Sequence, residues 1–111
     1  MNYSQEYIEE MEVGRKFRER YPINSYDISE ANRAFPGRNF MTPDVLSRGV
    51  IVPGVYVEIS AGRGLNKELI IGVTFRNSDG TPLEDDPSGL AWSYDEAVDL
   101  IKKVEERYRE E

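Results

Sequence analysis

Residues 50–76, VIVPGVYVEISAGRGLNKELIIGVTFR, decide the fold of this 111-residue chain. In the run at 55–59, β-branched apolar residues alternate with larger or charged ones, which is the period of a strand with one buried face. A polar, glycine-containing loop at 60–67 separates this run from a second β-forming run at 68–76. Two such runs joined by a short loop predict an antiparallel hairpin.

We expect a small antiparallel sheet of two or three strands within residues 50–92. The run Val50–Val52 is β-forming and precedes a Pro-Gly dipeptide, which is typical of turns. Asn77–Gly80 has the composition of a tight turn. The segment 89–92 is expected to add a short strand after it.

Two longer helices are expected to flank these strands. Ser93 and Glu96 match a capping box, in which a hydroxyl and a carboxylate each accept a hydrogen bond from a backbone N–H at the start of the helix. The apolar stripe that follows predicts a C-terminal helix over about 94–109. Ser4 predicts the start of an N-terminal helix over about 4–21, which the proline that follows ends.

The segment between the first helix and the sheet is less regular, and we expect short helices within 27–48. Asp27 or Ser29 is the candidate N-cap of one, and Thr42 that of another, which Gly49 ends. The predicted fold class is therefore α+β, in which helices pack on a small antiparallel sheet. The length is that of a single domain, over residues 1–111.

The formal charge of −7 is a local property of the chain. Residues 1–76 hold ten acids and ten bases, and residues 102–111 hold four of each, so the surplus lies between them. A concentrated field of one sign favours an oppositely charged partner. The only Trp lies in the same stretch, and Trp is enriched at interfaces. The predicted partner-binding residues are Asp79, Glu84, Asp85, Asp86, Trp92, Asp95 and Asp99.

The composition argues against several chemistries. The chain has no Cys and no His, so it lacks thiolates, the usual proton shuttle and the commonest transition-metal ligand. The acids around Gly80 do not match an EF-hand, because Phe75 would stand at its first ligand position. We expect no catalytic residue, no cofactor and no metal site, although a looser divalent site among the acids of 79–86 stays open.

The location of the protein is predicted from two negative observations. The N-terminus has neither a basic start nor an apolar run, so it does not have the pattern of a signal peptide. No apolar stretch approaches the roughly 20 residues that span a bilayer. We therefore expect a cytoplasmic protein without membrane contact.

The loop at 62–67 offers a different kind of site. Its glycines allow backbone amides to approach an anion, and arginine supplies a fork of donors. The candidate anion contacts are Arg63, Asn66 and Lys67.

The strands, the short strand and the helix of residues 50–105, with Ser93–Ala97 opening the helix, resemble two families. One is the HicB-type antitoxins, and the other is the arm-binding domains of phage integrases. The Pro-Asp-x-Pro-Gly-Cys stretch typical of these antitoxins is absent here, and integrase arm domains are basic where this region is acidic. The resemblance therefore implies a fold and transfers no functional residue.

These observations favour a non-enzymatic, acidic protein-binding module, such as an inhibitor or an antitoxin-like regulator of a phage or mobile element. It would dock the acids of 79–99 on a basic surface of another protein, and a homodimer stays open. Nucleic acid is not the partner we expect, but the alternative of a nucleic-acid-binding module would use Arg33, Arg38, Arg63, Lys67 and Arg76. A second alternative is a small-ligand or nucleotide pocket that uses Tyr21, Tyr26, Phe35, Arg38 and Phe40.

Overall fold

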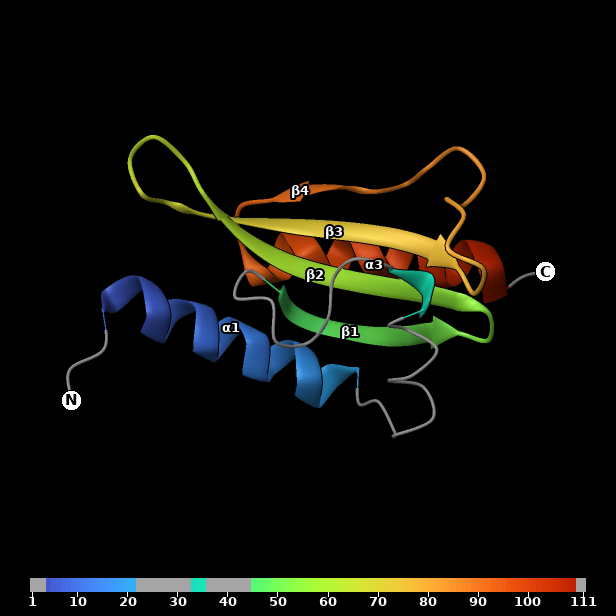
Figure 1. The fold of residues 1–111 in the computed structure, drawn as a ribbon, viewed down its shortest axis with the longest axis horizontal. Helices are drawn as coiled ribbons and strands as arrows, with labels where there is room; N and C mark the ends of the chain where they lie inside the picture. The colour runs from blue at the N-terminus through green and yellow to red at the C-terminus, as the bar shows by residue number, and fades with distance from the viewer. Residues whose placement is uncertain (1–3, 22–32, 36–44, 110–111) are drawn as a thin grey trace.

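The computed structural model describes residues 4–21, 33–35 and 45–109 (Figure 1). It has two long helices and one antiparallel sheet of four strands, in the spatial order β1-β2-β3-β4. The elements are α1 (Gln5–Arg20), β1 (Val45–Val52), β2 (Val55–Arg63), β3 (Leu69–Asn77), β4 (Gly89–Ala91) and α3 (Tyr94–Arg109). The α+β class is confirmed, with four strands in place of the two or three that we expected.

The additional strand is β1, which includes residues predicted to be helical. The prediction of a helix that ends at Gly49 is wrong, because residues 45–49 pair with β2, with Gly49 opposite Val57. This pairing continues into the Val50–Val52 run, so a single strand includes both the residues expected to end a helix and the β-forming run that follows them. Gly54, at a φ of +84°, makes the tight turn between β1 and β2.

The predicted hairpin is present as β2 and β3, and its strands are longer than the sequence pattern indicated. The register runs without interruption from Val55 opposite Asn77 to Arg63 opposite Leu69. The loop therefore shrinks to residues 64–68. The short strand expected at 89–92 is β4, which pairs with β3 over three residues.

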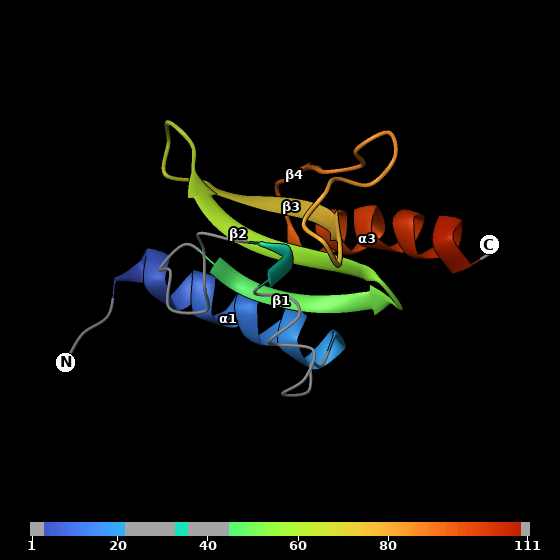
Figure 2. The ribbon, with the colours of Figure 1, turned by 45° about the vertical axis from the view of Figure 1, so that its right-hand side comes forward.

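The helix α3 covers one face of the sheet, as Figures 1 and 2 show. Its stripe of Ala97, Val98, Ile101 and Val104 is buried against apolar residues of the strands. The helix begins as the capping box predicted: Glu96 N–H donates to Ser93 Oγ at 3.1 Å. The Glu96 carboxylate accepts from the Trp92 N–H in place of the Ser93 N–H.

The helix α1 lies along β1, at the sheet edge opposite to β4 (Figure 1). Ser4 caps it, because Ser4 Oγ accepts from the Tyr7 N–H at 3.2 Å. Gly14 is buried where the helix crosses β1, and a Cβ at this position would lie 3.3 Å from the Leu46 carbonyl oxygen. Phe17, one turn further on, packs in the core, and the centre of its ring lies 4.9 Å from the centre of the Tyr94 ring.

A second, smaller cluster lies on the other face of the sheet. Ala34 and Phe35 pack there on Tyr56 of β2. Arg33 and Ala34 have helical backbone, whereas the expected caps Asp27, Ser29 and Thr42 lie outside the described residues.

Candidate functional site

The structure divides the predicted acidic surface into two groups. Asp79, Glu84, Asp85 and Asp86 belong to the connection between β3 and β4, which lies beside the C-terminal end of α3 (Figure 1). Asp95 and Asp99 lie in the first two turns of the same helix. The groups are separated by most of the length of α3, because Asp95 and Arg107 are about 18 Å apart along its axis.

The acids of the β3–β4 connection are held by local contacts. Asp79 Oδ1 accepts from the Thr81 hydroxyl at 2.6 Å and from the Thr81 N–H at 3.0 Å. These hydrogen bonds lower the pKa of the exposed Asp79 carboxyl below its usual value. Asp85 accepts from Arg107 of α3 at 3.2 Å, and both Asp85 and Asp86 have positive φ. Glu84 is exposed.

The exposed apolar side chains Leu90 and Trp92 lie between these two acidic groups in the chain. They stand on either side of the buried Ala91, and their exposed fractions are 59% and 58%. Leu90 belongs to β4, the last strand in the sheet order, and faces away from the core because alternate residues of a strand point to opposite faces. Trp92 is the first residue after this strand.

The backbone on both sides of Leu90 and Trp92 is fixed by carboxylates. The Glu96 carboxylate accepts from the Trp92 N–H at 2.8 Å, which places this acid directly beside the indole-bearing residue. On the other side, Asp86 Oδ1 accepts from the Ser88 N–H at 3.4 Å. One apolar pair at a sheet edge is thus bracketed by an acid at each end.

Sequence reasoning singled out Trp92 but missed Leu90 and Glu96 as members of the same surface. The signal for Leu90 was available: it is a large apolar residue at an alternating position next to Ala91, in the short strand expected at 89–92. The signal for Glu96 was its place in the capping box, which sets its side chain against the preceding residues.

The candidate anion loop is occupied by the chain's own charges. Arg63 Nη1 donates to the Glu9 carboxylate of α1 at 2.8 Å, and Arg63 Nη2 lies 3.6 Å from Glu10. The Asn66 N–H donates to the Glu68 carboxylate at 2.9 Å, and this carboxylate lies where a Cβ of Gly64 would stand. The structure therefore uses this loop to join the hairpin tip to α1.

Arg76, another base of the nucleic-acid alternative, is held by the 34–35 segment. Arg76 donates to the Ala34 carbonyl at 3.1 Å, and its guanidinium carbon lies 4.9 Å from the centre of the Phe35 ring. Arg33 and Lys67 are exposed, and Arg38 lies outside the described residues.

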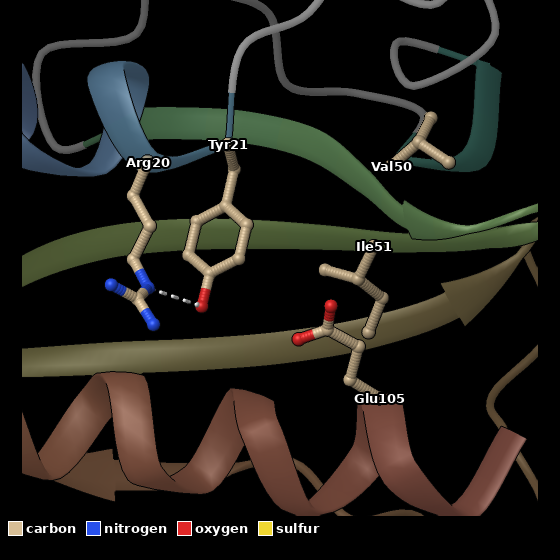
Figure 3. Close-up of a pocket in the computed structure, with 5 residues that line it drawn as sticks. All are labelled: Arg20, Tyr21, Val50, Ile51 and Glu105. Carbon is tan, nitrogen blue, oxygen red and sulfur yellow. Dashed lines mark hydrogen bonds between the residues drawn. The ribbon is translucent and has the colours of Figure 1, made fainter. Parts of the chain in front are cut away.

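A pocket of about 440 Å³ lies between the end of α1, β1 and α3, where Arg20 and Glu105 approach from opposite sides (Figure 3). Arg20 Nε donates to the Tyr21 hydroxyl at 3.3 Å, while Glu105 accepts from Arg109 at 2.7 Å. Burial raises the pKa of the Tyr21 phenol above its ordinary value. Among the residues of the small-ligand alternative, Tyr21 lines this pocket, Phe35 packs on the opposite face of the sheet, and Tyr26, Arg38 and Phe40 lie outside the described ranges.

Two further observations concern the described residues alone. Within 4–21, 33–35 and 45–109, no group of three or more carboxylates is gathered in the manner of a metal site. In the same part of the chain, neither helix combines the length and the apolar surface that crossing a membrane requires.

Comparisons with family models, curated proteins and solved structures give no match to this chain. Its function is therefore argued from the geometry of its own residues. The sheet edge at β4 gathers three of the seven predicted partner-binding residues, Asp85, Asp86 and Trp92, together with Leu90 and Glu96. We call this the β4 edge surface and define it as Asp85, Asp86, Leu90, Trp92 and Glu96.

Proposed function

We propose that this chain is a non-enzymatic protein-binding module that contacts its partner through the β4 edge surface. The observation that carries the proposal is the exposure of Leu90 and Trp92, at 59% and 58%, on either side of the buried Ala91 at the end of the sheet. Exposed apolar residues are ordinary when they are scattered, but a contiguous pair with a polar rim is typical of an interaction site.

The two side chains are suited to act as the anchor of an interface. Trp is among the residues that contribute most to binding energy, because its large ring buries much apolar surface with only two torsions to fix. The backbone N–H of Trp92 is held by the Glu96 carboxylate, so the backbone that carries the indole is fixed before a partner binds. A restrained anchor loses less conformational freedom when a partner binds.

The charge of this region defines the kind of partner. Residues 77–101 carry seven acids and no base, and the β4 edge surface contains three of these acids. The negative field is increased by three neighbouring acids that are not part of the β4 edge surface: Glu84, Asp95 and Asp99. Such a field accelerates the encounter with a basic protein and repels the phosphate backbone of nucleic acid. An inhibitor or antitoxin-like regulator that covers a basic surface of its target is the role that suits these properties.

The test compares alanine variants of Leu90 and Trp92 with an alanine variant of an exposed leucine elsewhere on the chain. Wild-type chain, Leu90→Ala, Trp92→Ala and the control Leu65→Ala are immobilised and exposed to a nuclease-treated lysate of the organism that encodes the chain. Leu65 is a matched control because it is fully exposed at the hairpin tip, away from β4. We expect one basic protein to be retained by wild type and by Leu65→Ala and lost by the other two variants. Equal retention by all four proteins would refute the proposal.

A further inference from the structure

We propose that the partner binds by strand addition, in which a short extended segment of a basic protein pairs with the open edge of β4. This inference rests on the proposed function and specifies how that surface recognises its partner. The mode is one of the recurring ways in which proteins bind extended segments: main-chain hydrogen bonds give affinity and alternate side chains give specificity.

The two edges of the sheet differ in what lies beside them. The helix α1 lies along β1, whereas β4 pairs with β3 on one side and has no further strand beside it among the described residues (Figure 1). An edge strand directs alternate N–H and C=O groups outward, and these groups are a template for another strand. The edge at β4 is therefore the one that can accept an addition.

The available length of this edge is short. The Trp92 N–H is held by Glu96, the Ser88 N–H donates to Asp86, and Pro87 has no N–H. The backbone groups left for a partner lie within Gly89–Ala91. An added strand can form only a few main-chain hydrogen bonds there, so Leu90 and Trp92 have to supply the remaining contact.

The spacing along the edge predicts the sequence of the partner segment. Leu90 and Trp92 are two residues apart, so the segment should carry apolar side chains at positions i and i+2. The acids Asp86 and Glu96 bracket the stretch from 87 to 92, which spans about 20 Å when extended. Basic residues should therefore flank the apolar pair at both ends of the segment.

A second copy of this chain does not satisfy these requirements. Antiparallel pairing of β4 with the β4 of another molecule would bring Asp85 and Asp86 of each chain toward the acidic start of α3, with Asp95 and Glu96, in the other. The net charge of −7 would oppose such a dimer. Charge complementarity therefore favours a cationic segment of a different protein.

The experiment uses a displayed dodecapeptide library as the probe. Peptides are selected on the immobilised full-length chain, with counter-selection on the Leu90→Ala/Trp92→Ala double variant, whose fold is checked by its thermal unfolding. The prediction is that the selected peptides are basic at both ends and have apolar residues at i and i+2. If no peptide survives the counter-selection, because the double variant retains every peptide that the wild-type chain retains, the strand-addition proposal and the proposed function both fail.

Backbone methylation of a selected peptide then separates the two proposals. Methylation of one alternate set of backbone nitrogens should weaken binding about tenfold or more, while methylation of the other set should have little effect, because only one set faces β4. Binding that needs Trp92 but shows no alternation would overturn strand addition and leave the proposed function standing. Self-association of the chain that Trp92→Ala abolishes would identify a second copy as the occupant and overturn it as well.

Discussion

The guanidinium of Arg48 and the carboxylate of Glu58 meet at 2.7 Å between β1 and β2, where they are direct register partners. Arg48 is 1% exposed and Glu58 4% exposed, so the pair is shielded from solvent. Phe35 covers it, with its ring centre 5.7 Å from the guanidinium carbon. Burial of two charges costs free energy of desolvation. Their mutual attraction offsets part of this cost, so the pair can lie within the packed face of the sheet.

Removal of one partner should therefore cost more than removal of both. We expect Glu58→Ala to lower the free energy of unfolding by about 3–5 kcal/mol, because it leaves the Arg48 charge buried without its register partner. The double variant Arg48→Met/Glu58→Leu should recover a large part of that loss. Urea denaturation measures both values. A double variant that is less stable than the single variant would contradict this account.

Gly14 should tolerate alanine but not a branched side chain. Its Cβ would lie 3.0 Å from Arg18 Nη1 and 3.3 Å from the Leu46 carbonyl oxygen, contacts that a rotation of the Arg18 side chain and a small shift of α1 can relieve. The gain in helix propensity of about 1 kcal/mol then offsets the strain in Gly14→Ala. Gly14→Val adds two methyl groups against β1 and should lower the free energy of unfolding by about 1–3 kcal/mol. Equal stability of the two variants in urea denaturation would disprove this packing.

The hydrogen bonds between Asp79 and Thr81 predict a specific pH effect. Because they lower the pKa of the Asp79 carboxyl in the folded state, their stabilisation is present above the pKa of the unfolded chain. It is lost as the pH falls through the folded-state pKa. Thr81→Val removes the hydroxyl donor and should raise the Asp79 pKa toward its ordinary value, as an NMR titration of the carboxyl carbon can measure. An unchanged pKa would show that the hydroxyl is not the main cause.

The start of α3 depends on Ser93. Its Oγ accepts from the Glu96 N–H, and its loss leaves an end amide without a partner. We expect Ser93→Ala to reduce the free energy of unfolding by about 1 kcal/mol. Ser93→Asp, which keeps an acceptor at the N-cap, is the control and should unfold at nearly the wild-type urea concentration. If both variants lose the same stability, the cap is not the cause.

The acids beside β4 should control the rate of association. Glu84→Gln/Asp86→Asn removes two charges there and spares the pair between Asp85 and Arg107. Glu12→Gln/Glu106→Gln removes two exposed charges from the helices and serves as the matched control. With the captured partner, the first variant should associate several-fold more slowly at low salt, and the difference should fade as salt rises. Equal rates for the two variants would argue against steering by the β4 region.

The parts of the fold that could be predicted were those with local signals. The caps Ser4 and Ser93 and the alternation in β2 each depend on neighbours within a few residues of the chain. The strand at 45–49 could not be found in this way, because it forms by pairing with residues 57–60 of the next strand. The same pairing buries Arg48, which is 1% exposed.

The candidate site shows the same limit. Acids that are close in sequence were expected to form one surface, but α3 separates Asp95 from the β3–β4 connection. Arg63 was a candidate anion contact until Glu9, 54 residues earlier, proved to be its partner. The exposure of Trp92 depends on which strand lies at the edge of the sheet. The number of strands decides this, and the local sequence pattern around Trp92 does not reveal it.

The most direct measurement of the central claim follows Trp92 itself. The chain contains one Trp, so incorporation of fluorotryptophan gives a single fluorine NMR signal that reports on the β4 edge surface. When the captured partner is added, we predict that this signal shifts and loses its sensitivity to a soluble paramagnetic agent, because the exposed indole becomes buried. A partner that binds the chain while the signal and its solvent exposure stay unchanged would contradict the account.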